Sequence, residues 1–158
     1  MEIRVRTALF LLFAALMPGQ ALAANQVALY NNVFVERVST DAQGKQRILL
    51  EEPQVVVPGD RLVFVLNYRN AGAQPADNFV ITNPMPAAVR FADAGNTSPL
   101  VSVDGGKQWG LLSDLTVTMT DGTRRSAQPA DVTHVRWAFQ KPIPVGGTGK
   151  LMFRGVVK

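Results

Sequence analysis

The sequence predicts an all-β protein, a sandwich of about eight or nine short strands. Two observations carry this prediction. After the first 24 residues no stretch keeps the helical period of apolar side chains; apolar and polar residues alternate instead in short runs. Between these runs lie clusters of Gly, Pro, Asn and Asp, which are typical of turns.

The clearest strand is Arg61–Asn70, where alternation puts Leu62, Phe64, Leu66 and Tyr68 on one face and more polar positions on the other. We expect this strand to be half-buried. The other expected strands, in chain order, are 26–38, 45–51, 79–82, 89–91, 100–103, 107–109, 115–119, 132–140 and 151–157. Segments 26–38 and 45–51 are expected to pair as a hairpin, as are 100–103 and 107–109. Residues 124–131 are expected to form a polar loop.

Turn residues separate these strands and set their register. A Pro-Gly-Asp turn precedes Arg61, an Asn-x-Gly turn follows it, two prolines close the next strand, and Asp-Gly-Gly predicts a hairpin turn. The turn residues that define the fold in this prediction are Pro58, Gly59, Asp60, Asn70, Gly72, Pro84, Pro86, Asp104 and Gly105. The strand spacing indicates a sandwich of the immunoglobulin-like type.

The first 23 residues have the three parts of a secretory signal peptide: a positive start, the apolar run 8–17, and a small-x-small cleavage site. We expect cleavage between Ala23 and Ala24, leaving one domain over residues 24–158. The apolar run is shorter than the roughly 20 residues of a membrane-spanning helix. The sequence therefore predicts an exported protein, soluble in the periplasm or outside the cell, with no membrane span after processing.

Composition excludes several kinds of protein. The chain has no cysteine, so it has neither a disulfide nor the acceptor residue of a lipid anchor. Its net charge of +4 is spread along the sequence, whereas nucleic-acid binding requires a clustered basic patch. We therefore expect no nucleic-acid partner.

The turn and strand pattern resembles the DUF11 domain family, immunoglobulin-like modules of bacterial and archaeal envelope and secreted proteins. The resemblance covers about Val55–Val157, and one position departs from it, because Asn83 stands where the family usually has Asp. The matching positions are Pro58, Gly59, Asp60, Asn70, Gly72, Thr82, Pro84, Pro86, Gly146 and Gly147. The resemblance implies a single-copy member without established enzymatic activity.

Catalytic and metal-binding patterns are weak. With one histidine, His134, and no cysteine, neither a nucleophile with its base nor an ordinary zinc site is expected. The loop aspartates lack the spacing of a calcium-binding loop. Those that precede glycine have the sequence typical of hairpin turns. We expect no enzyme, no metal and no cofactor.

Two tryptophans remain. Trp137 alternates with apolar neighbours and is expected in the core. Trp109 is open to two interpretations: a cap at the end of the sandwich, or an exposed contact for a ligand.

The favoured function is an exported, non-enzymatic module that binds or assembles with another envelope or secreted protein. It would act through loops at one end or through an edge strand, for which 26–38 and 151–157 are candidates. The alternative is a small periplasmic carbohydrate-binding accessory protein with Trp109 as its platform.

Overall fold

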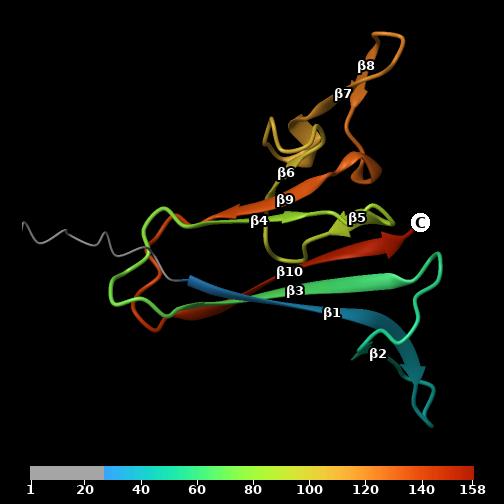
Figure 1. Cartoon of the computed structure of the whole chain (residues 1–158). Helices are drawn as coiled ribbons and strands as arrows, with labels where there is room; N and C mark the ends of the chain where they lie inside the picture. Colours follow the sequence, from blue (N-terminus) through green and yellow to red (C-terminus); the bar gives the residue numbers. More distant parts are fainter. Residues whose placement is uncertain (1–26) are drawn as a thin grey trace, which may run out of the picture.

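The computed structural model describes residues 27–158 and shows an all-β protein of ten strands in antiparallel sheets (Figure 1). Two short 3-10 turns, η1 (Leu112–Asp114) and η2 (Pro129–Asp131), are the only helical elements in this range. The strands are β1 (Val27–Thr40), β2 (Gln46–Glu51), β3 (Arg61–Asn70), β4 (Val80–Pro84), β5 (Val89–Asp93), β6 (Leu100–Ser102), β7 (Thr116–Thr118), β8 (Arg124–Ser126), β9 (His134–Ala138) and β10 (Thr148–Val157). The expected signal peptide and its Ala23–Ala24 cleavage site lie outside the described residues.

The strands form three sheets. The largest has the order β2-β1-β3-β10-β5, a second has the order β4-β9-β6, and β7 pairs with β8 alone. In Figure 1 the first two sheets lie face to face, and the β7–β8 ribbon projects from the second. Among residues 27–158, no helix has the length and apolar character needed to cross a membrane.

The main core lies between the two larger sheets. Leu66 and Phe153 from the first sheet pack with Ile81, Val135 and Trp137 from the second. The Phe153 ring stacks on that of Phe64, with 4.6 Å between centroids. Trp137 is therefore a core residue, as predicted.

β3 has the predicted bounds, but it is more deeply buried than the half-buried strand that the alternation predicts. Val63 and Val65, on its second face, are also buried. β3 is the central strand, so its neighbours β1 and β10 crowd these positions from both sides. Val63 lies between Phe34 and Arg154, and Val65 lies between Asn32 and Met152.

Three other expectations about strands were wrong. The segment 107–109 is not a strand. The Asp104 carboxylate accepts hydrogen bonds from the backbone N–H groups of Lys107 and Gln108, and these bonds hold the segment in a turn. Part of the expected polar loop 124–131 is β8, paired with β7. Finally, β10 is not an edge strand, because β3 and β5 flank it.

Candidate functional site

The most exposed part of the fold is the hairpin that β1 forms with β2. β1 changes partner at Val35, whose neighbours are Leu62 of β3 and Glu51 of β2. Beyond this residue β1 pairs with β2 alone and bends away from the rest of the fold (Figure 1). We call residues 36–51 the arm. Every residue of β2 is exposed.

One face of the arm carries a group of three apolar side chains, called here its apolar face. Val38 lies opposite Ile48, and Leu50 lies opposite Glu36, so these side chains share a face. Val38 is 66% exposed, Ile48 64% and Leu50 48%. Exposed apolar side chains that share a face make this part of the arm a candidate interaction surface.

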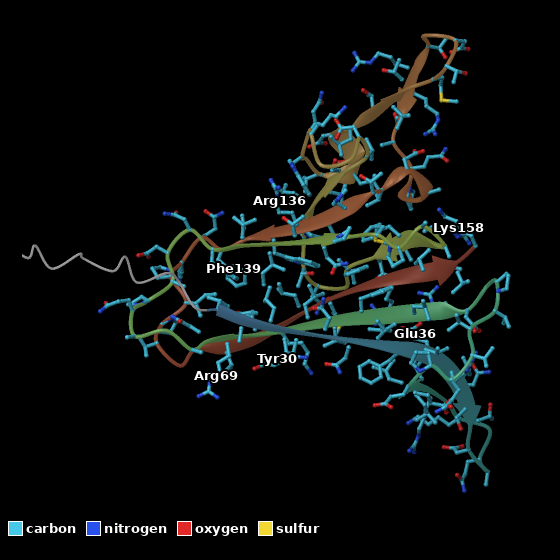
Figure 2. The ribbon with its side chains drawn as sticks, in the orientation of Figure 1. Tyr30, Glu36, Arg69, Arg136, Phe139 and Lys158 are labelled. Atoms are coloured by element: carbon cyan, nitrogen blue, oxygen red, sulfur yellow. The ribbon has the colours of Figure 1, made fainter. Side chains whose placement is uncertain are left out.

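Beside the apolar face lies a cluster of four charged side chains from four strands. We call Glu36, Arg61, Asp93 and Arg154 the charge cluster. The Glu36 carboxylate accepts hydrogen bonds from Arg61 Nε at 2.9 Å and from Arg154 Nε at 2.6 Å. Arg154 Nη1 also donates to Asp93 at 3.0 Å. Figure 2 shows Glu36 where β1 enters the arm.

These contacts keep the cluster ionised. Burial of Glu36 opposes its charged form, but the hydrogen bonds from Arg154 and Arg61 outweigh burial and lower the pKa of the carboxyl. For Asp93, burial is again outweighed, here by the Gly95 backbone N–H and by Arg154, so its pKa is also lowered. Hydrogen bonds to Glu36 and then Asp93 raise the pKa of Arg154. The cluster is a fixed, balanced set of charges.

The arm and the charge cluster enclose a hollow of about 330 Å³. It is lined by Val38 and Ile48 on one side and by the four members of the charge cluster on the other. Apolar contacts beside ordered arginines are typical of protein–protein interfaces. The hollow is therefore the best candidate for a recognition site among residues 27–158.

Trp109 lies elsewhere, on the outer face of β9, and is partly buried. The Arg136 guanidinium covers one face of its ring, 3.5 Å from the centroid, and the His134 ring meets it edge-on. The indole Nε1 donates to the Gly106 carbonyl at 2.9 Å. Figure 2 shows Arg136 on this outer face. One face of the expected ligand platform is thus occupied by the protein itself.

The turn residues proposed from the sequence shape or stabilise the loops in which they lie. Gly59 adopts a φ of 94°, and the Asp60 carboxylate accepts the Val57 N–H and a 2.7 Å bond from Arg37. Pro84 ends the edge strand β4, where a missing N–H donor is tolerated, and Pro86 follows it. Gly105, with a φ of 79°, lies in the Asp104 loop. None of these residues lines the hollow beside the arm.

Asn70 is more than a turn residue. It is 1% exposed, and its Nδ2 donates to the carbonyls of Gln74 and Ile143 at 2.8 and 2.9 Å. Its Oδ1 accepts the N–H of Gly72 at 3.0 Å. Asn70 therefore ties two loops together at one end of the molecule.

No group of three or more His, Asp or Glu side chains that could hold a metal gathers within residues 27–158. His134 Nδ1 lies 3.0 Å from Thr133 Oγ1. Of the loop aspartates, Asp121 bonds to Thr123, and Asp131 forms an ion pair with Arg125 at 2.6 Å. These carboxylates serve their own loops.

Sequence reasoning missed the candidate site. The sequence did contain a clue to the arm. Val38, Ile48 and Leu50 occupy alternating, apolar positions in the two segments that were expected to pair as a hairpin. The charge cluster carried none, because its members come from β1, β3, β5 and β10 and meet only in the folded chain.

The chain is thus an all-β protein in which an exposed apolar face lies beside a cluster of ordered charges. Comparisons with family models, with curated proteins and with solved structures found no match for this chain.

Proposed function

We propose that this protein is an exported, non-enzymatic module with an immunoglobulin-like β-sandwich of the DUF11 type. It binds another envelope or secreted protein through the hollow beside the arm. The observation that carries the proposal is the exposed apolar face of Val38, Ile48 and Leu50 next to the charge cluster. The leader-like first residues support export.

A partner on the arm explains an otherwise costly arrangement. A lone two-stranded hairpin is only marginally stable in water, and no second layer formed by residues 27–158 covers the apolar face of the arm. Burying a fully exposed apolar side chain contributes about 1.5–3 kcal/mol, and covering these three partly exposed ones would contribute a part of that each. The charge cluster is already ordered by its own hydrogen bonds, so less side-chain entropy is lost when a partner docks.

The proposal is tested by crosslinking in intact cells, followed by mass spectrometry of the captured proteins. We expect a specific crosslinked partner that is lost with Ile48→Asp, because a charge in the apolar face cannot be buried cheaply. Val145→Asp is the matched control, since Val145 is also exposed, at 55%, but lies outside the arm. Identical crosslinks in the wild type and Ile48→Asp would contradict the proposal.

No observation in the structure favours the carbohydrate-binding alternative. A sugar platform requires an open aromatic face, and Arg136 covers one face of Trp109. A glycan panel titrated against tryptophan fluorescence tests this alternative. A saturable change that Trp109→Ala abolishes would replace our proposal with it.

A further inference from the structure

The free edge of β1 is a second surface, separate from the arm. From Val27 to Phe34, β1 pairs with β3 on one side, and β2 takes the opposite edge only from Val35 onward. No described residue pairs with the other side of this stretch, which therefore presents unpaired backbone groups along the edge of the five-stranded sheet. Leu29 and Tyr30 within it are 46% and 62% exposed. Figure 2 shows Tyr30 at this edge.

The other edge strands carry features that discourage pairing with another chain. Charged side chains, prolines and very short length all have this effect. β2 has Arg47 and Glu51, β4 has Pro84, and β5 has Arg90 and Asp93, whereas β6, β7 and β8 have only three residues each. The stretch Val27–Phe34 contains neither a charge nor a proline. It is the unprotected edge of the described fold.

We propose that two copies of this chain associate through this edge, with Ala28–Phe34 of each copy paired antiparallel about Asn31. A two-fold axis perpendicular to the sheet keeps each side chain on its own face, so the register must be centred on a residue. The paired stretch ends at Phe34, directly before Val35, where Glu51 of β2 occupies the edge. Val27 of the second copy would face Val35, so it has to leave the shared edge at that point.

The sequence of the edge is complementary to itself in this register. Leu29 lies opposite Val33, and Ala28 lies opposite Phe34, so apolar side chains meet. Tyr30 lies opposite Asn32, and Asn31 lies opposite its own copy, where one amide can donate to the other. A register centred on Tyr30 would instead oppose Leu29 with Asn31 and Ala28 with Asn32.

The second copy also covers apolar surface inside the edge. Asn31 and Val33 line a groove of about 220 Å³ between β1 and β4, together with Phe64, Leu66 and Pro84. Leu29 of the second copy lies opposite Val33 and therefore reaches this groove. Association through β1 uses no residue of the apolar face of the arm, so it stands independently of the proposed function.

Charge reversal at Asn31 tests the symmetry axis. The protein is expressed from its full sequence, purified as the host processes it, and measured by sedimentation across concentrations. We expect a dimer that Asn31→Lys or Asn31→Asp alone weakens by about tenfold, because like charges then stand directly opposite. An equimolar mixture of the two variants should restore dimers, because Lys then opposes Asp.

Two controls accompany this measurement. Asn31 is exposed, so both variants should keep the circular dichroism spectrum of the wild type and, at concentrations where all three proteins are monomeric, its melting temperature. Thr82→Lys, on the exposed edge strand β4, should leave the dimer intact. A wild type that is monomeric at every concentration, or a mixture no more dimeric than each variant alone, would overturn the proposal.

Single cysteines test the register, since the chain has none of its own. A disulfide needs β-carbons about 3.5–4.5 Å apart, which only a self-opposed position approaches. Under mild oxidation Asn31→Cys should give a covalent dimer, whereas Tyr30→Cys should do so only when combined with Asn32→Cys. Crosslinking by Tyr30→Cys alone, without crosslinking by Asn31→Cys, would show the register to be wrong.

Discussion

Arg154 donates a 2.6 Å hydrogen bond to Glu36, although the two residues lie 118 positions apart in the chain. The bond crosses β3 and joins β10 to β1 at the base of the arm. Because Arg61 and Asp93 share the same cluster, this pair couples the exposed arm to the body of the fold.

We expect Glu36→Gln to lower the free energy of unfolding at neutral pH by about 1–3 kcal/mol, the range for losing hydrogen bonds between charged groups. The pKa of Glu36 is lowered below its usual 4.5, so its contribution is present above that value and is lost as pH falls through the folded pKa. The difference between variant and wild type should therefore shrink in acid. Urea unfolding at several pH values measures this.

Glu52→Gln is the control for this change, because Glu52 is an exposed carboxylate in the connection after β2. It should alter unfolding little at any pH. Equal stability of wild type and Glu36→Gln at neutral pH would show that the cluster adds nothing to the fold.

Asn70→Asp should destabilise the protein strongly, by about 2–4 kcal/mol, because a buried carboxylate cannot donate to the Gln74 and Ile143 carbonyls. Acid should partly rescue this variant, since a protonated carboxyl regains one donor. Thermal unfolding between neutral and acidic pH provides the measurement. Asn96→Asp, in an exposed loop, should behave like the wild type throughout.

Gly149→Ala should also be destabilising, by about 1–3 kcal/mol. Gly149 lies opposite Tyr68 in the β10–β3 pair, and an added methyl group would collide with the Tyr68 ring. Chemical unfolding of Gly149→Ala, Tyr68→Ala and the double variant tests this contact. The losses in free energy of unfolding caused by the two single substitutions should not add in the double variant, because Tyr68→Ala removes the collision. Strict additivity would show that the collision does not occur.

Arg136→Ala should uncover Trp109 while changing stability by only about 0.5–1 kcal/mol, the usual worth of a cation–π contact at an exposed site. Tryptophan emission should shift to longer wavelength, and quenching by acrylamide should increase. The exposed Arg69→Ala is the matched change and should leave both signals unaltered. Unchanged emission in Arg136→Ala would mean that the guanidinium does not cover the ring in solution.

Local patterns predicted the strands where side-chain alternation and turn chemistry agreed. β3 has its predicted bounds because a Pro-Gly-Asp turn and an Asn-x-Gly turn enclose an uninterrupted alternation. The hairpin predicted at Asp104-Gly105-Gly106 failed although its turn signal was good. There the carboxylate and the Ser102 hydroxyl bind nearby backbone N–H groups and compete with strand pairing.

The sequence alone determined the all-β class, the bounds of the central strand, and the core position of Trp137, because these follow from local alternation and turn residues. Tertiary structure decided which strands lie at the edges, that the arm extends beyond the packed part of the two sheets, and that Arg136 covers Trp109. It also brought Glu36, Arg61, Asp93 and Arg154 together. Strand order and contacts between distant residues depend on how the sheets pack, and local patterns carry no information about that packing.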